Sequence, residues 1–300
     1  MRVLVVGRLG QIATELCARL PAAGHAVLAE EPPALDLTRA ESVAAAIAGF
    51  RPDVVVNAAA YTAVDRAEDE AELAFAVNAA GPGILGEAAA RAGIPVVHFS
   101  TDYVFDGSKG RPYVEDDPPA PLGVYGASKL EGERRLLAAN PRSLILRTAW
   151  VCSAQGGNFV KTMLRLGRER AEVRVVADQQ GAPSFADDLA EAVVGLLPRL
   201  AAAPAGDPCF GVFHLTGAPW TTWHGFAEAI FAGAAARGQP APRLIAITTA
   251  EYPTRARRPA DSRLDCRRSA ALLGLHPADW RKGLARCLDR LLPAMEGVQR

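Results

Sequence analysis

The sequence has no excess of charge of either sign. Its 300 residues include 33 Lys and Arg and 33 Asp and Glu, so the formal net charge is zero at pH 7. Like charges gather only in a short basic run around Arg255–Arg258. Proteins that bind nucleic acid or a membrane surface usually present a basic patch or stripe. We therefore expect neither kind of partner.

Cysteine pairs are also lacking. The 5 cysteines are scattered and form no C-x-x-C pair; they are Cys17, Cys152, Cys209, Cys266 and Cys287. An odd, dispersed set argues against a disulfide scaffold and against a zinc site. We expect buried free thiols in a reducing compartment, and we predict no metal site.

Long apolar runs and targeting segments are missing too. Met1-Arg2 leads directly into Val3-Leu4-Val5-Val6-Gly7, which is too short for the core of a signal peptide. No uninterrupted apolar stretch approaches the roughly 20 residues of a membrane-spanning helix. We expect a cytoplasmic protein that does not enter a membrane.

The first half of the chain alternates short apolar runs with helical patterns. Runs of this kind, each followed by a helix, are typical of parallel β-α-β units. They predict a Rossmann-type, doubly wound parallel α/β sheet with its ligand at the carboxyl ends of the strands. The expected strands are Val3–Val6, His25–Ala29, Val54–Asn57, Val96–Ser100 and Leu144–Thr148, and the expected helices are Gln11–Ala22, Arg39–Phe50, Arg66–Ala92 (interrupted near Gly81-Pro82) and Tyr125–Ala139.

The pattern changes after Val176, where proline and glycine become frequent. We expect an NAD(P)-binding domain over residues 1–176 and, over 177–300, mainly a smaller C-terminal substrate-binding lobe; whether the chain crosses between them stays open. Its expected helices are Phe185–Leu197, Trp223–Arg237 and Gly283–Leu292, and its expected strands are Gly211–Leu215 and Leu244–Ile247.

The first strand is followed by a glycine turn. Gly7 permits a tight turn, and Gly10 lets the backbone approach a diphosphate at the start of the helix that begins at Gln11. The spacing G-x-x-G-x-x-A is closer to short-chain reductases than to G-x-G-x-x-G, and Ala13 stands where a third glycine is usual. An ordinary strand-to-helix turn has the same composition, but the position after the first strand favours dinucleotide binding.

Two features conflict over the choice of nicotinamide cofactor. Glu30, at the end of the second strand, would hold the adenosine ribose hydroxyls and favour NADH, whereas Arg8 would bind a 2′-phosphate and favour NADPH. We take NADPH as the expected cofactor and leave NADH open. Asp36-Leu37 follows at the position of an adenine contact, although Asp36 before Thr38 also fits a helix N-cap.

Tyr125 and Lys129 lie 4 positions apart, on one face of an expected helix. A free tyrosine has a pKa of about 10, and a nearby ammonium would lower it. Tyr125 would then donate a proton to a carbonyl oxygen while a hydride reaches the carbonyl carbon. Lys129 would also hold the nicotinamide ribose, and a hydroxyl at the end of the fourth strand, Thr101 or Ser100, would bond to the same carbonyl oxygen.

Small residues follow the third strand. Ala58, Ala59 and Ala60 would let a cofactor lie against the backbone, and simple close packing explains them equally well. We expect Asn78, within the long helical stretch, to be a buried structural hydrogen-bonding group.

Together these segments resemble the dTDP-4-dehydrorhamnose reductase family of the extended short-chain dehydrogenases. The resemblance runs in order through almost the whole chain. It rests on Gly7–Gln11, Asn57–Asp65, Ser100–Gly107, Tyr125–Lys129, Leu146–Trp150, Asp178–Pro183 and Arg258–Asp265.

The resemblance implies reduction of the 4-keto group of a dTDP-sugar, dTDP-4-keto-L-rhamnose, to give dTDP-L-rhamnose. By position, Tyr125 would be the proton donor, Lys129 its helper and Thr101 the hydroxyl at the keto oxygen. The implied cofactor contacts are Gly10, Gln11, Ile12, Asp36, Leu37, Ala60, Tyr61 and Thr62, and the implied substrate contacts are Asp102 and Trp150. Trp150 also fits a core or interface anchor.

The chain departs from the family pattern at Asp261, where asparagine is frequent. The change adds charge beside Arg257, Arg258 and Arg263, which either bind the substrate diphosphate or form a solvated basic face. Some family members bind magnesium, and Glu15 is one conceivable ligand; with no others identified, no metal is predicted.

Two rival functions share these features. The first is another nucleotide-sugar short-chain enzyme, such as an epimerase. The second is a non-catalytic regulatory subunit like that of methionine adenosyltransferase, which the presence of Thr101, Tyr125 and Lys129 disfavours. The oligomeric state, a homodimer included, and the final use of the product stay open.

Overall fold

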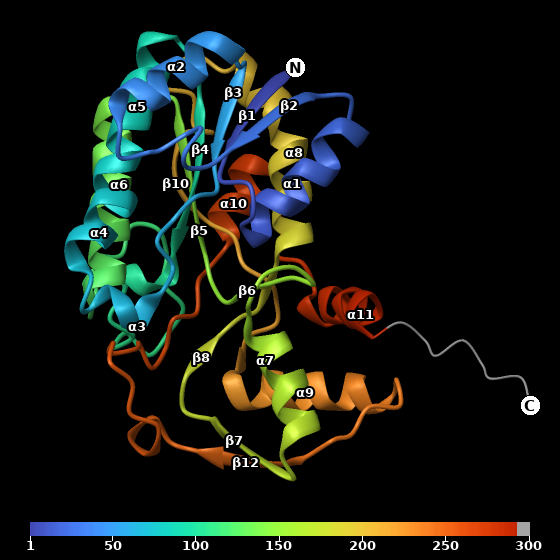
Figure 1. Ribbon diagram of the computed structural model, residues 1–300. Coiled ribbons are helices and arrows are strands. Elements are labelled where there is room, and N and C mark those ends of the chain that lie inside the picture. Colours follow the sequence, from blue (N-terminus) through green and yellow to red (C-terminus); the bar gives the residue numbers. More distant parts are fainter. Residues whose placement is uncertain (293–300) are drawn as a thin grey trace, which may run out of the picture.

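The computed structural model describes residues 1–292 and consists of an upper lobe built on a sheet and a smaller lower lobe (Figure 1). The upper sheet has six parallel strands in the order β10-β5-β4-β3-β1-β2. Their bounds are β1 Arg2–Val6, β2 Ala26–Glu30, β3 Val54–Asn57, β4 Val96–Thr101, β5 Ser143–Thr148 and β10 Gly211–His214. This confirms the predicted Rossmann-type fold.

Helices cover both faces of the sheet (Figure 1). On one face lie α1 (Gln11–Ala22) and α8 (Ala186–Ala202), which pack on each other; on the other lie α2 (Ala40–Phe50), α5 (Gly81–Arg91) and α6 (Val124–Ala139). The chain winds from β1 outward to β2 and then returns to β3 on the other side of β1. Ligands of such sheets bind where the strand order reverses, here above β1 and β3.

The long helical stretch expected over residues 66–92 is built differently. A short α3 (Val64–Ala67) is separate, and α4 (Ala71–Phe75), a π-helical turn η1 (Ala76–Ala80) and α5 follow one another. The regular α-helix is interrupted by η1, which ends directly before Gly81-Pro82, although the chain stays helical through this point.

The run Ala71–Arg91 is long and apolar enough by composition to cross a membrane, contrary to the expectation that no such stretch exists. Half of it is buried inside the fold, where α5 packs against α2 and α6. A core helix passes the same test, so the run is weak evidence for a membrane span.

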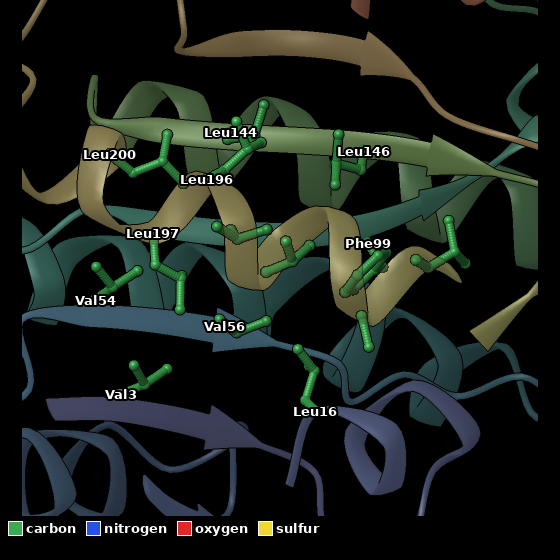
Figure 2. Packing of buried hydrophobic residues seen from close by; sticks show 14 of the residues in the cluster. Val3, Leu16, Val54, Val56, Phe99, Leu144, Leu146, Leu196, Leu197 and Leu200 are labelled. Atoms are coloured by element: carbon green, nitrogen blue, oxygen red, sulfur yellow. The ribbon is translucent and has the colours of Figure 1, made fainter. Parts of the chain in front are cut away.

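The main core fills the space between the sheet and the α1/α8 face. Figure 2 shows α8 laid across the strands, with Leu196, Leu197 and Leu200 facing Val54 and Leu144. Burying one such side chain stabilises the fold by about 1.5–3 kcal/mol. This packing fixes the strands, and therefore the loops at their carboxyl ends. Among the cysteines, all are free, and only Cys17 is not fully buried.

The lower lobe has its own core and draws on both sides of residue 176. Its elements are β6 (Val151–Cys152), α7 (Phe159–Glu169), β7 (Glu172–Val176), β8 (Gln180–Gly181), β9 (Ser184–Phe185), β11 (Thr221–Thr222), α9 (Trp223–Ala235), β12 (Arg243–Ile247) and α11 (Trp280–Leu291). Between them the chain returns to the upper lobe to form α8, β10 and α10 (Arg267–Leu273). Short 3-10 turns η2 (Asp102–Val104) and η3 (Thr249–Glu251) complete the chain.

Candidate active site

The glycine turn lies above β1 and β3. Gly7 has φ +94°, and a Cβ there would lie 3.2 Å from the backbone N of Ala59. Helix α1 begins after Gly10 with no side-chain cap and no acidic residue in its first turn. Its first N–H groups, which have no partner within a helix, therefore form a site for an anion such as a diphosphate.

The side chains of Gln11 and Ile12 are already used elsewhere. Gln11 donates through Nε2 to the Val151 carbonyl (3.2 Å) and accepts through Oε1 from Asn158 Nδ2 (2.9 Å). Ile12 packs against the main core. Both residues can meet a diphosphate only through their backbone N–H groups. Sequence reasoning missed that Gln11 ties the glycine turn to the lower lobe.

Two glutamates lie at the end of β2. Glu30 is partly exposed at the last position of the strand. The Glu31 carboxylate accepts hydrogen bonds from the backbone N–H groups of Arg8 and Leu9, both at 3.2 Å. Arg8 is exposed and forms no ion pair within residues 1–292. The cation remains available for a phosphate, while Glu31 shapes the turn.

Asp36 and Leu37 are engaged by their own neighbourhood. Asp36 accepts from the backbone N–H (2.9 Å) and hydroxyl (2.7 Å) of Thr38, and these bonds lower the pKa of its carboxyl. It is not the N-cap of α2, which is Arg39. The Leu37 side chain is buried in the core under α5. Any adenine contact must use the outer edge of this turn.

The loop after β3 is held by Asn78, which is buried as predicted. Its amide accepts from the Tyr61 N–H (2.8 Å) and donates to the Tyr61 carbonyl (3.0 Å) and the Ser128 hydroxyl (3.1 Å). The Tyr61 phenol turns away to Glu70 (2.6 Å). The backbone of Ala59, Ala60, Tyr61 and Thr62 is therefore fixed beside the crevice, next to the helix that carries Tyr125.

Tyr125 and Lys129 lie in the first turns of α6, and their environments differ. Lys129 is 2% exposed, and its Nζ donates to the Phe99 carbonyl (2.6 Å) and contacts His98 Nε2 (3.2 Å). Burial lowers the pKa of Lys129 to about 8, opposed by the charge of Glu133. Burial raises the pKa of the half-buried Tyr125 to about 12, against a hydrogen bond with Thr101.

This corrects one expectation. Lys129 is not among the groups that shift the pKa of Tyr125, because its Nζ is directed to the Phe99 carbonyl. With a pKa of about 12, Tyr125 is protonated at neutral pH.

The two hydroxyls at the end of β4, Ser100 and Thr101, have different partners. The Ser100 hydroxyl binds Glu133, which forms a buried ion pair with Arg147 of β5 (2.6 Å). Thr101 is directed to the site: it donates to Asp102 Oδ1 (3.1 Å) and accepts from the Tyr103 N–H (3.2 Å). Of the two hydroxyls, Thr101 is the one that lies beside Tyr125.

Asp102 is 3% exposed, and its Oδ2 has no hydrogen-bond partner in the described part of the chain. Burial raises the pKa of this carboxyl to about 6, and the nearby hydroxyls of Ser262 and Thr101 oppose this shift. An unpartnered carboxylate oxygen is costly to bury, so it is suited to accept a hydrogen bond from a ligand hydroxyl.

Trp150 lies just after β5, the strand next to β4 in the sheet. It has φ +48° and stacks on Trp223 of α9, with ring centroids 3.6 Å apart. Gly181 leaves room for the indole, since a Cβ there would lie 2.6 Å from Trp150. Sequence reasoning missed Trp223, which comes from a segment far away in the chain.

Behind this aromatic pair lies a cavity of about 510 Å³ in the lower lobe. Its wall combines α7, β7 and the loop after β12, and includes Trp223, Tyr252 and Arg258. Arg258 is paired with Asp65 (2.9 Å) and Arg263 with Asp261 (2.6 Å). Arg257 lies with Tyr125 along a small neighbouring pocket.

The carboxylate of Glu15 is already engaged in ion pairs. It is 4% exposed and is paired with Arg290 (2.8 Å) and Arg19. Over residues 1–292, His, Cys, Asp and Glu side chains form no cluster of three or more that could hold a metal ion.

Comparison with known proteins places the chain in a family. Residues 1–292 match the model described as the RmlD substrate binding domain. The dTDP-4-dehydrorhamnose reductase of Aggregatibacter actinomycetemcomitans is 44% identical over 94% of this chain and 97% of its own length.

Two crystal structures extend the similarity. A dTDP-4-dehydrorhamnose reductase from Clostridium acetobutylicum superposes with a TM-score of 0.90 at 36% identity, covering 97% of this chain and 99% of that one. The enzyme of the same name from Bacillus anthracis, in complex with NADP, gives 0.88 at 33% identity, covering 96% and 98%. The chain thus belongs to the RmlD substrate binding domain family, and these relatives are named dTDP-4-dehydrorhamnose reductases.

Proposed function

We propose that this protein reduces the 4-keto group of dTDP-4-keto-L-rhamnose with NADPH, giving dTDP-L-rhamnose. The observation that carries the proposal is the meeting of Thr101 and Tyr125 at the carboxyl end of β4, beside a crevice suited to a dinucleotide. Relatives named dTDP-4-dehydrorhamnose reductase, which are 40–45% identical over nearly their full length, support it.

The residues around the crevice fit a nicotinamide dinucleotide. The uncapped start of α1 would take the diphosphate on the backbone N–H groups after Gly10. Arg8 would take a 2′-phosphate, which favours NADPH, and Glu30 lies where the ribose hydroxyls would be held. The outer edge of the turn at Asp36 and Leu37 would line the adenine, with the Leu37 side chain remaining in the core, while Ala59, Ala60, Tyr61 and Thr62 would line the nicotinamide side.

The cofactor, when bound, supplies the hydride. Tyr125 supplies the proton, and its raised pKa of about 12 keeps it protonated and ready to donate at neutral pH. Thr101 would hold the keto oxygen beside the phenol. A protonated Lys129 would stabilise the phenolate that forms as the proton leaves.

The substrate would lie between the lobes. The flat indole of Trp150 would cover the apolar side of the deoxysugar, and the free oxygen of Asp102 would accept a sugar hydroxyl. The dTDP group would extend past Trp223 into the lower-lobe cavity. We place this reaction in the cytoplasm. Size-exclusion chromatography with light scattering would decide whether the protein is a homodimer.

The test is NADPH or NADH oxidation followed at 340 nm with dTDP-4-keto-L-rhamnose. Substrate-dependent oxidation, faster with NADPH, is expected. If protein that binds NADPH oxidises it with no rate above background, the sugar is wrong and other nucleotide sugars come next. Release of the cofactor during purification separates this reaction from that of an epimerase, which would retain it.

A further inference from the structure

Beneath Lys129 lies a buried chain of polar side chains that the proposed reaction does not use. Asn57 on β3 and His98 on β4 are paired across the parallel strands, and both are 0% exposed. The His98 ring bridges two partners: Nδ1 lies 3.0 Å from Asn57 Nδ2, and Nε2 lies 3.2 Å from Lys129 Nζ.

The orientation of the Asn57 amide is fixed by the backbone. Its Oδ1 accepts the N–H of Ala59 at 3.1 Å. A flipped amide would place two donors face to face at that contact, so Nδ2 is the atom that faces His98. Because Nδ2 can only donate, His98 Nδ1 must accept and carries no proton.

The proton of a neutral imidazole must then lie on Nε2, where it points at Lys129. Burial, and to a smaller extent the charge that Lys129 carries when protonated, lower the pKa of His98 well below its usual value, so the ring is neutral. An ammonium has donors only and cannot accept this hydrogen. An uncharged amine can: its lone pair accepts from His98 while one of its hydrogens is donated to the Phe99 carbonyl at 2.6 Å.

The other charged groups around Lys129 do not cancel this arrangement. Glu133, one turn further along α6, favours the ammonium, but its carboxylate is shared with Arg147 of β5 and with Ser100 of β4. Tyr125, one turn earlier on α6, is protonated. Asn57, His98 and Phe99, from the two strands beneath, complete the surroundings.

We propose that Asn57 and His98 are positioning residues that present an Nε2–H donor to Lys129 and so stabilise its amine form in the cofactor-free protein. The proposal rests on the proposed reductase function only for its effect on rate. Since the ammonium is the form that assists Tyr125, kcat/KM should fall as pH rises through the Lys129 pKa.

The direct test is the tautomer of His98 in the whole protein, read from long-range ¹H–¹⁵N correlations of the histidine rings. His98→Gln identifies the signal by its loss. The expected pattern is a protonated Nε2 and a bare Nδ1 across neutral pH. A protonated Nδ1, or an imidazolium, overturns the proposal whether or not the protein proves to be a reductase.

Asn57→Asp should reverse the direction of the hydrogen bonds from residue 57 through His98 to Lys129. A carboxylate keeps the acceptor for Ala59 but accepts from Nδ1–H, so His98 should switch tautomer and Nε2 should accept from an ammonium. The basic limb of kcat/KM should then move upward by about one pH unit. A loss of activity at all pH values with no move of the limb and no change of tautomer would mean that Asn57 only supports the fold.

Asn78→Asp is the matched control. It places the same new charge in the same buried region, next to Ser128 on α6, without touching His98. The His98 tautomer should stay as in the wild type. A tautomer switch in this variant too would show that bare charge, not the Asn57 contact, sets the state of His98, and would overturn the proposal.

Discussion

The two halves of the site are built from different materials. On the proposed cofactor side, the contacts would come from backbone and small residues: the Gly7 turn, the start of α1 and the Ala58–Ala60 segment. On the proposed substrate side, they would come from large or charged side chains, namely Asp102, Trp150 and Trp223. The cofactor side is contiguous with β1 and β3, whereas the substrate side gathers segments far apart in the chain.

The difference shows where specificity resides. A backbone site recognises a diphosphate wherever the same turn occurs, so it identifies a class of cofactor. The proposed substrate side depends on how the lower lobe meets β4 and β5, so we expect it to select the sugar nucleotide. Tyr125 and Thr101 stand at the boundary between the two.

The largest effect is expected at that boundary. Tyr125→Phe removes the donor proton and should lower kcat roughly 10²–10⁴-fold, while NADPH binding by fluorescence titration stays unchanged. Tyr113→Phe is the control, since it also removes a hydroxyl, one bonded to Asp106 (2.8 Å) outside the site. Equal turnover in Tyr125→Phe and Tyr113→Phe would remove Tyr125 from its role.

The next largest effect is expected at Asp102 on the proposed substrate side, and it depends on pH. The folded-state pKa of Asp102, about 6, lies above its ordinary value of 3.8, so its stabilising effect on the fold is present below pH 4 and is lost as pH rises through 6. At 1.36 kcal/mol per pKa unit, Asp102→Asn should be about 3 kcal/mol more stable than the wild type at pH 7.

Urea unfolding of Asp102→Asn at pH 7 and pH 4 checks this. The gain should vanish at pH 4, and the KM for the dTDP-sugar should rise, because the carboxylate acceptor is gone. A gain of equal size at both pH values would contradict the assigned burial of the charge.

A glycine pair tests the cofactor half. Gly7→Ala forces a side chain to adopt φ +94° and places its Cβ 3.2 Å from Ala59 N, so it should cost about 1–2 kcal/mol of unfolding free energy. At Gly10 a Cβ meets only the Ala58 carbonyl, at 3.8 Å. Gly10→Ala should therefore fold normally yet weaken NADPH binding.

Thermal unfolding and NADPH titration of both variants distinguish the two glycines. If Gly10→Ala bound NADPH as tightly as the wild type, the diphosphate could not lie against that turn.

The smallest expected effect belongs to the aromatic wall. Trp223→Leu removes the stack on Trp150, which should cost about 0.5–1.5 kcal/mol of unfolding free energy. Because Trp150 is then less well held, the KM for the dTDP-sugar should rise. The Kd for NADPH should not change. Steady-state kinetics and a parallel NADPH titration check it. An equal rise in the KM for the dTDP-sugar and the Kd for NADPH would show that Trp223 does not act on the substrate side alone.

The sequence predicts the two parts of the fold to different extents. Five of the six strands of the upper sheet were predictable because buried parallel strands read as continuous apolar runs. The sixth strand, β10, and the helix α8 were expected in the C-terminal lobe but belong to the upper lobe. The α7 helix was not predicted, although Asn158 caps it and Val160, Met163, Leu164 and Gly167 form its buried face.

Contacts between distant segments could not be predicted from spacing. Nothing in the sequence says that Trp223 reaches Trp150, that Gln11 bonds to Asn158, or that Lys129 points at Phe99 and leaves the pKa of Tyr125 high. These depend on the packing of the lower lobe and on burial, which one sequence does not specify.

The most direct test of the division between the halves is a crystal structure with NADPH and dTDP bound. We expect the cofactor diphosphate at the start of α1, the nicotinamide beside Tyr125 and Thr101, and the dTDP in the lower-lobe cavity past Trp223. A dTDP bound away from that cavity, or a nicotinamide out of reach of the Tyr125 hydroxyl, would contradict the account.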